Sequence, residues 1–327
     1  MYFTGGIRGN SLNLHKYVPP LRKGFYKVLN ISVSGDAPKN FISVYRFGKG
    51  VHKCNCRTWP KFIAKVGQKW YPIESVTEHL LNAIGEELGL TMAASELVMA
   101  GSQLRFLSKY FLSKDEILVH GAEIFDGYIY QKNELEQMEE DGLARKFFTF
   151  QFAENAIRSR FPEEADSIFA GFVKMLIFDS ITGNNDRHFY NWGVIKHISN
   201  KKRPTFAPIY DSARGLFWNN TEEKIIAWSS DPKRLPEHIK KYAEGSKPKT
   251  GWEGLEELNH FQLIEKIFST GGRYKGICKE LINSNNKQKI LNLVDDKFSN
   301  VYSKDRKELI KRCLDYRFER LIAIVTN

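Results

Sequence analysis

Cysteine is scarce in this sequence: 327 residues contain 4 cysteines, at positions 54, 56, 278 and 313. So few thiols in a chain of this length exclude a fold held together by disulfides and are typical of a reducing compartment. Cys54 and Cys56 follow His52, which raises the alternative of a zinc site. A structural zinc needs four ligands, and no second pair of cysteines or histidines lies nearby in the sequence. We therefore expect free thiols in a hairpin.

Long apolar runs are also missing. No stretch approaches the ~20 consecutive apolar residues that a membrane-spanning helix requires. The first residues, Met1-Tyr-Phe-Thr-Gly-Gly-Ile-Arg8, lack the charged start and the apolar core of a secretory signal. We therefore expect no membrane segment and a cytoplasmic protein.

Repeats and low-complexity tracts are absent as well, and the composition is that of a globular protein. Hydrophobic residues make up 42% of the chain and aromatic residues 13%. These fractions supply a packed core and argue against a disordered chain. The length allows two lobes of ordinary domain size.

Acidic residues are outnumbered by basic ones, and the formal net charge is +11. The basic residues gather at positions 196–203, 233–249 and 306–320. Such clusters can attract nucleic acid or an RNA-bound protein. They are more often solvated loops and helix faces, so we do not expect direct nucleic-acid binding. Prolines 232, 236 and 248 lie in or beside the second cluster and indicate a mobile segment there.

One polar loop carries most of the functional information. Residues 183–193 read Gly-Asn-Asn-Asp-Arg-His-Phe-Tyr-Asn-Trp-Gly; Asn191 follows Asp186 by five positions, and Asp211 follows Asn191 by twenty. Phosphate transfer from Mg-ATP uses such a set: one carboxylate orients the attacking hydroxyl, while an amide oxygen and a second carboxylate hold the metal. The flanking apolar segments predict a helix, this loop, a hairpin and then Asp211. The alternative is a set of ordinary turns, since Asn and Asp hydrogen-bond their own backbone.

The same residues resemble the HipA family of bacterial Ser/Thr kinases. Members carry an Asp-x-His-x-x-Asn loop and then a strand ending in Asp, as do Asp186, His188, Asn191 and Asp211 here. The longer Gly-Asn-x-Asp-Arg-His-x-x-Asn-Trp-Gly pattern is similar to the CtkA-type kinases of this superfamily. The resemblance implies that Asp186 is the catalytic Asp and that Asn191 and Asp211 hold Mg²⁺. His188 matches the His of the catalytic loop, and we interpret it as structural, buried and hydrogen-bonded to the loop backbone.

A second match lies near the N-terminus, where Ser32-Val-Ser-Gly-Asp-Ala-Pro-Lys39 precedes an expected strand at residues 41–46. By itself this composition would be an ordinary turn. HipA-type kinases carry a Ser-x-Ala/Ser-Gly-x-x-x-Lys loop over the nucleotide phosphates, which implies phosphate contacts from Ser32, Ser34, Gly35 and Lys39. In HipA and HipT kinases, serines of this loop are autophosphorylated. The resemblance marks Ser32 and Ser34 for that modification, whose charge would repel ATP and displace the loop.

The next segments hold further candidates. The family pattern places the ATP-binding lysine at Lys65, whereas Lys61 fits a solvated strand lysine. A helix is expected from residue 76 to 88, because apolar residues keep helical spacing and Gly89 follows. Glu78 matches the family's Glu early in this helix and would steady Lys65. The alternative is a surface Glu.

The expected fold is α+β and bilobal, like that of protein kinases. A β-rich N-lobe takes residues 1–106, a hinge 107–115, and a helical C-lobe with the catalytic loop 116–327. A buried strand is expected at 104–112, and the backbone around Leu107 to Tyr110 would contact adenine. Helices are expected at 261–282, 288–298 and 303–325, where the last segment is amphipathic.

The chain departs from HipA at its start. HipA has a long subdomain before its phosphate loop, whereas 31 residues precede Ser32 here. The layout is closer to the short HipT or CtkA type. A HipA-like mode of antitoxin binding is therefore in doubt, and any equivalent module would be a separately encoded protein.

The resemblance implies an ATP- and Mg²⁺-dependent protein Ser/Thr kinase that autophosphorylates. By analogy its role is that of a toxin-type growth regulator acting on a protein substrate such as an aminoacyl-tRNA synthetase. One alternative is a secreted CtkA-like effector kinase, and another is a lipid kinase. A different class is a pseudokinase that binds nucleotide or a partner without turnover, which the complete set of catalytic and metal positions argues against.

Overall fold

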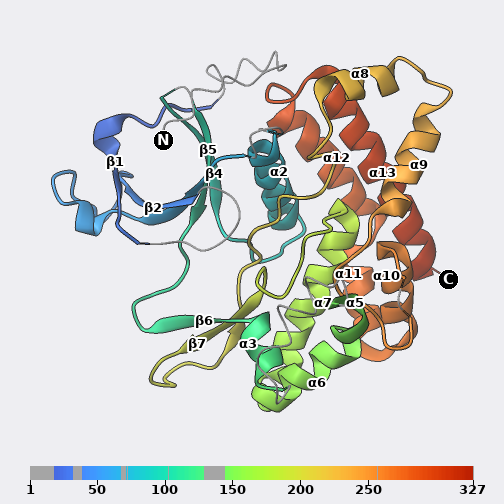
Figure 1. Cartoon of the computed structure of the whole chain (residues 1–327), viewed down its shortest axis with the longest axis horizontal. Coiled ribbons are helices and arrows are strands. Elements are labelled where there is room, and N and C mark those ends of the chain that lie inside the picture. The colour runs from blue at the N-terminus through green and yellow to red at the C-terminus, as the bar shows by residue number, and fades with distance from the viewer. Residues whose placement is uncertain are drawn as a thin grey trace.

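The computed structural model describes residues 18–31, 39–67, 71, 73–101, 103–128, 144–255 and 257–326. An N-terminal lobe built on a β-sheet adjoins a larger helical lobe (Figure 1). This arrangement confirms the predicted α+β fold with a β-rich N-lobe and a helical C-lobe.

The N-terminal sheet is antiparallel, with the strand order β1-β2-β3-β5-β4. Side chains alternate across it, so Ile42, Phe62 and other apolar residues form a small cluster on one face. Lys39 and Lys65 face each other across β2 and β3 on the opposite face. The strands are β1 (Tyr26–Val28), β2 (Lys39–Val44), β3 (Lys61–Lys65), β4 (Ser95–Ala100) and β5 (Gln103–Lys109).

Helix α2 (Glu74–Glu87) lies against strands β4 and β5 of this sheet (Figure 1). Its apolar positions, among them Val76, Leu80 and Ile84, are fully buried. The helix ends before Gly89, whose φ of 74° suits the left-handed turn that stops a helix. The predicted helix is thus confirmed, and its packing brings Glu78 to the inner face of the sheet.

A second sheet has the strand order β6-β7-β8, and its middle strand begins at Gly193, where the loop predicted to be catalytic ends. Its strands are β6 (Glu116–His120), β7 (Gly193–His197) and β8 (Thr205–Phe206). Helix α3 (Gly121–Asp126) follows β6, and its first two N–H groups donate to the Trp192 and Phe189 carbonyls at 3.0 Å each. The hairpin expected after the loop is therefore present, and its second strand, β8, is shorter than its first, β7.

Helix α7 (Ala165–Thr182) runs through the centre of the C-terminal lobe and contacts α6, α10, α11 and α13. Its run from Met175 to Phe178 is buried all round, as a central helix requires. Around it are α5 (Ala144–Phe147), α6 (Phe150–Arg160), α8 (Glu222–Ser229), α9 (Leu235–Gly245), α10 (His260–Ser269), α11 (Gly272–Leu281), α12 (Ser284–Phe298) and α13 (Lys304–Thr326).

Three expectations about these elements need correction. The segment expected at 261–282 is two helices, because the chain turns at Gly271, where φ is 81°. The segment expected to be mobile contains α9, which packs on α13. Pro236 lies in the first turn of α9, where a missing N–H costs no helical hydrogen bond. Strand β5 continues through Lys109, so the link between the sheets begins at Tyr110 rather than at residue 107.

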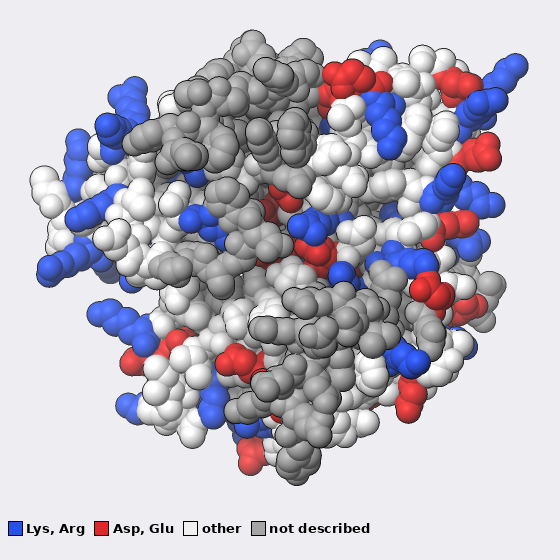
Figure 2. Space-filling model, viewed as in Figure 1, with Lys and Arg blue, Asp and Glu red and all other residues white. Residues whose placement is uncertain are grey.

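Basic side chains gather over the sheet lobe, at the left of Figure 2. Exposed residues there include Lys27, Lys49, Lys53 and Arg57. Among the described residues, no helix has the length and apolarity needed to span a bilayer. All cysteines are free thiols, and Cys54 is exposed.

Candidate active site

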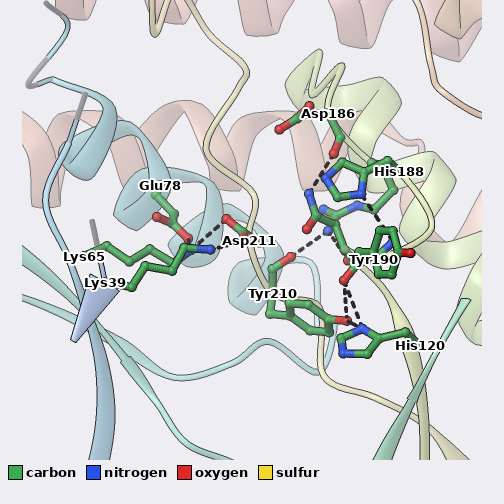
Figure 3. Close-up of polar contacts among 11 residues, drawn as sticks. Lys39, Lys65, Glu78, His120, Asp186, His188, Tyr190, Tyr210 and Asp211 are labelled. Carbon is green, nitrogen blue, oxygen red and sulfur yellow. Dashed lines mark hydrogen bonds and ion pairs between the residues drawn. The ribbon is translucent and has the colours of Figure 1, made fainter. Parts of the chain in front are cut away.

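Four charged side chains from separate elements meet where the lobes face each other (Figure 3). Lys65 Nζ lies 2.6 Å from Glu78 Oε1 and 2.7 Å from Asp211 Oδ1. Lys39 Nζ lies 3.4 Å from Asp211 Oδ2. Strand β2, strand β3, helix α2 and the segment after β8 each contribute one of these residues.

Burial and charge act against each other in this cluster. Burial alone would lower the pKa of Lys65, but the nearby Glu78 and Asp211 carboxylates raise it above its usual value. Burial would likewise raise the pKa of Asp211, yet Lys65 and Lys39 hold it well below its usual range. Burial raises the pKa of Glu78 to about 7, against the opposing effect of Lys65. Lys65 and Asp211 are therefore both charged at neutral pH.

The loop predicted to be catalytic, residues 183–193, begins where α7 ends; it is called the catalytic loop below. Gly183 closes the helix in a left-handed conformation, with φ 68°. The loop then folds on itself: the His188 N–H donates to the Asp186 carbonyl, and the Asn191 N–H donates to the His188 carbonyl, each at 2.9 Å. The Asn191 amide Nδ2 also donates to the Asp186 carbonyl at 2.9 Å. These bonds place Asp186 and Asn191 on one short, fixed turn.

Asp186 is half-buried, with a side chain that is 22% exposed. Arg214 Nη1 lies 3.2 Å from its Oδ1. Burial raises the pKa of Asp186 above its usual value, while Arg214, His188 and Lys249 act to lower it. A carboxylate in such a place can accept a proton from a hydroxyl that approaches it.

Arg187 is buried and holds the catalytic loop in place through its hydrogen bonds. Its Nε and Nη2 donate to both carboxylate oxygens of Asp179 at 2.9 and 3.0 Å, and each of these side chains is 2% exposed. Its Nη1 donates to the Asn191 and Tyr210 carbonyls at 2.8 and 2.6 Å. Its Nη2 also donates to Ser212 Oγ at 2.6 Å. One guanidinium thus joins α7, the catalytic loop and both neighbours of Asp211.

A further contact joins the loop to β6. His120 Nδ1 lies 3.0 Å from the Tyr190 carbonyl and 3.1 Å from Tyr210 Oη (Figure 3). Tyr210 Oη also donates to the Tyr190 carbonyl at 3.1 Å. These bonds tie the residue before Asp211 to the catalytic loop.

Asn191 and Asp211 have the donor set for a magnesium ion. Because the Asp186 carbonyl can only accept, the Asn191 side chain must turn its nitrogen toward it, which leaves Oδ1 for a cation. Asp211 has a φ of 55°, a left-handed conformation that Asp tolerates better than most residues. Among the described residues no group of three His, Cys, Asp or Glu side chains forms a metal site. An amide and a carboxylate completed by phosphate oxygens and water is a usual arrangement for magnesium.

The structure brings six of the residues that the sequence singles out into two groups. Lys39, Lys65, Glu78 and Asp211 are in contact, and Asp186 and Asn191 share one turn of the loop. Ser32, Ser34 and Gly35 lie outside the described residues.

His188 is half-buried rather than fully buried. The Tyr190 N–H donates to its Nδ1 at 3.2 Å. This is a loop-backbone contact of the kind expected for a structural histidine.

The predicted adenine contact is made by the backbone around Leu107 to Tyr110, at the end of β5. Leu107 lies inside β5, between β3 and β4, where it pairs with Ala64 and Glu96. Its side chain is fully buried in the small cluster. Tyr110 lies beyond the strand, is 38% exposed and contacts the Phe41 ring edge-on at 5.1 Å. The Leu107 side chain thus faces away from any ligand, and the backbone contact with adenine stays a prediction.

The sequence predicted neither a role for Asp179 or Arg187 nor the pairing of Arg214 with Asp186. One signal was present: Asp179 is a carboxylate inside an otherwise apolar helical run, and a buried charge requires a partner. Nothing in the sequence names Arg187 as that partner.

The sequence also matches the family model of the HipA-like C-terminal domain over residues 31–282, more than half of the chain. The chain belongs to this family. The HipA-like match covers Lys39, Lys65, Glu78, the catalytic loop and Asp211 together.

Individual relatives are more distant. The serine/threonine-protein kinase CtkA of Helicobacter pylori is 26% identical over 144 residues, which are 44% of this chain and 40% of that protein. The aligned region thus spans less than half of that relative.

Solved structures resemble the HipA-like chain over more of its length. The Helicobacter pylori proinflammatory kinase CtkA matches with a TM-score of 0.70 at 17% identity, covering 93% of this chain and 97% of that one. A chain of the Shewanella oneidensis complex of HipA, HipB and operator DNA matches with a TM-score of 0.54 at 14% identity, covering 90% and 64%. At these identities the likeness concerns the fold.

Proposed function

We propose that this protein is a serine/threonine protein kinase that transfers the γ-phosphate of ATP. The observation that carries this proposal is the position of Lys65, which joins Glu78 of the N-lobe to Asp211 of the C-lobe. A lysine held by one carboxylate, beside a second carboxylate suited to a metal, is what phosphate transfer requires.

Each residue then has a distinct task. Lys65 and Lys39 bind phosphate oxygens, and Glu78 keeps Lys65 in place. Asp186 orients the acceptor hydroxyl and accepts its proton as the oxygen attacks the γ-phosphorus. The bond from that phosphorus to the bridging oxygen breaks, and ADP leaves with the bonding electron pair. Asn191 and Asp211 would hold Mg²⁺, which neutralises charge on the phosphates.

The N-terminal serines extend the proposal. Modification of Ser32 or Ser34 would add a dianion to the segment that leads to Lys39, in competition with the phosphates of ATP. We infer that these serines are sites of autophosphorylation that lowers activity.

The cellular role is proposed from the family. The Shewanella relative is part of a toxin–antitoxin system with HipB, which supports a toxin-type growth regulator with a separately encoded antitoxin. An aminoacyl-tRNA synthetase is a candidate substrate by analogy alone. The likeness to CtkA, named a proinflammatory kinase, supports the alternative of an effector kinase.

The test is mass spectrometry of dephosphorylated protein after incubation with Mg-ATP, beside the Asp186→Asn and Asp211→Asn variants. We expect added phosphate in the wild type alone, on Ser32 or Ser34. A general kinase substrate protein, added to the same reaction, tests whether phosphate is transferred to another protein. No transfer to either, with nucleotide binding intact, would overturn the kinase proposal in favour of a pseudokinase.

A further inference from the structure

A hollow in the C-terminal lobe opens beside Asp186. Its volume is about 410 Å³. It shares Asp186 with the site above, but Lys39, Lys65 and Asp211 do not line it. The lining residues are Asn185, Asp186, Arg214, Trp218, Gly245, Lys247 and Lys249.

The hollow is positively charged. Three cationic side chains and one carboxylate line it. Arg214 pairs with Asp186, and Lys247 pairs with Glu257. Lys249 is half-buried. Its charge acts on the nearby Asp186 carboxylate. Because three cations face a single carboxylate, the hollow keeps a net positive charge that attracts an anion.

The segment that carries the two lysines is fixed at both ends. Ser246 Oγ donates to the Gly183 carbonyl at 3.0 Å, at the start of the catalytic loop. The Gly251 N–H donates to the Phe148 carbonyl at 3.1 Å, and the Phe150 N–H donates to the Gly251 carbonyl at 2.9 Å. Proline at position 248 restricts the chain between them. Lys249 is therefore presented in a set position relative to Asp186.

Trp218 forms an apolar wall beside these charges. The Arg214 guanidinium lies 5.3 Å from the centre of its ring, which holds Arg214 over the indole face. A peptide entering the hollow would thus meet an aromatic surface for its apolar atoms and cations for an acidic group.

We propose that this hollow binds an anionic side chain of the protein substrate, either a carboxylate or a phosphorylated residue, next to the serine or threonine that is phosphorylated. The inference rests on the kinase proposal and specifies its substrate class. The cations gather in one hollow beside Asp186, whereas a nucleic acid would require a stripe of cations along a groove. The acidic group of the substrate pairs with the Lys249 ammonium, while the hydroxyl of the neighbouring serine or threonine reaches the Asp186 carboxylate.

The test uses serine peptides that carry Glu, phosphoserine, Ala or Lys at each position flanking the acceptor. Turnover is measured with Mg-ATP, and equilibrium binding by calorimetry with the same peptides. For the wild type we expect kcat/KM at least about tenfold higher for the best anionic peptide than for its Lys counterpart, mostly through KM for peptide. The KM for ATP should be the same in all arms. Comparing Glu with phosphoserine identifies the source of the anion.

Variants of Lys249 then locate the effect. Lys249→Glu should reverse the preference toward Lys peptides, Lys249→Ala should abolish it, and Lys249→Arg should keep most of it. The matched control is Lys241→Glu, the same charge change at an exposed position of α9, which should leave the preference unchanged. Thermal unfolding checks that every variant is folded.

Failure of this inference differs from failure of the kinase proposal. Equal turnover of all peptides would overturn the anion site and leave the kinase intact. Equal binding of anionic peptides by the wild type and Lys249→Glu would overturn it even without turnover. Binding of a single-stranded oligonucleotide with the same dependence on Lys249 would overturn it in favour of a nucleic-acid site.

Discussion

Lys65 of β3 and Asp211 of the C-terminal lobe are in direct contact, with 2.7 Å between Nζ and Oδ1 and 146 positions between them in the sequence. The proposed phosphate-binding cation and the proposed metal-binding carboxylate therefore neutralise each other. Phosphate oxygens would compete with Asp211 for Lys65, and a metal ion would compete with Lys65 for Asp211. Because the two residues belong to different lobes, binding of nucleotide or metal would change a contact between the lobes.

Replacing Asp211 by Asn should separate metal binding from phosphate binding. Lys65 and Lys39 would lose their shared partner, so metal-free ATP should bind more tightly than to the wild type. Phosphate transfer should fall at least about 100-fold because a charged metal ligand is lost. Calorimetry with ATP, with and without Mg²⁺, and a turnover assay measure the two effects. Asp296→Asn, at an exposed position of α12, should change neither; weaker metal-free binding in Asp211→Asn would contradict the competition.

Replacing Lys65 by Met should destabilise the fold. Glu78, 4% exposed, would remain buried without its partner, and breaking such a pair costs about 3 kcal/mol or more. The pKa of Glu78, already about 7, would rise further once the cation is gone. A carboxyl group whose pKa is raised in the folded state contributes stability at low pH that is lost as pH rises. The loss in free energy of unfolding of Lys65→Met relative to the wild type should therefore grow from pH 6 to pH 8.

The double variant Lys65→Met/Glu78→Gln is the control for this effect. It removes the ionisable group of residue 78, so most of the free energy of unfolding should return. The difference in that free energy from the wild type should also depend less on pH. Activity should stay lost. Chemical denaturation at several pH values measures this. A double variant no more stable than Lys65→Met would show that the pair is not the cause.

Arg187→Ala should be among the most damaging single changes in the C-lobe. It leaves the buried Asp179 unpaired and frees the carbonyls of Asn191 and Tyr210, so the free energy of unfolding should drop by about 3–5 kcal/mol. Arg187→Lys should recover only part, because an ammonium cannot replace the two parallel bonds to Asp179. The matched control is Arg158→Ala: its side chain is 44% exposed, and surface pairs contribute within about 1 kcal/mol. Similar losses for Arg158→Ala and Arg187→Ala would refute the role of Arg187.

Arg214→Gln should move the acidic limb of the pH–activity profile to higher pH. Burial raises the pKa of Asp186 and Arg214 opposes this, so removing the cation raises that pKa further. Asp186 accepts a proton only when ionised, so the variant should lose activity relative to the wild type as pH falls. Profiles of kcat measure the shift, with Arg234→Gln, 75% exposed, as the control. An acidic limb at the wild-type pH would exclude an electrostatic effect of Arg214 on Asp186.

The sequence by itself determined the elements whose pattern is local. Apolar residues at helical spacing and a following Gly89 predicted α2, and the same periodicity predicted α13, because a helix that buries one face repeats its apolar positions. The residue types and spacing of Asp186, Asn191 and Asp211 predicted the chemistry of the loop. These features are readable because neighbours in the chain remain neighbours in the fold.

The tertiary structure alone decided which distant groups meet. Leu107 was assigned to the link because apolarity does not mark where a strand ends; the partners on β3 and β4 do. Arg187 is paired with Asp179 of α7. The hydrogen bonds of Ser246 and Gly251 hold the segment that places Lys249 beside Asp186. A polar side chain is satisfied by whichever groups the folded chain brings within ~3 Å, and that depends on the path of the whole chain rather than on spacing in the sequence.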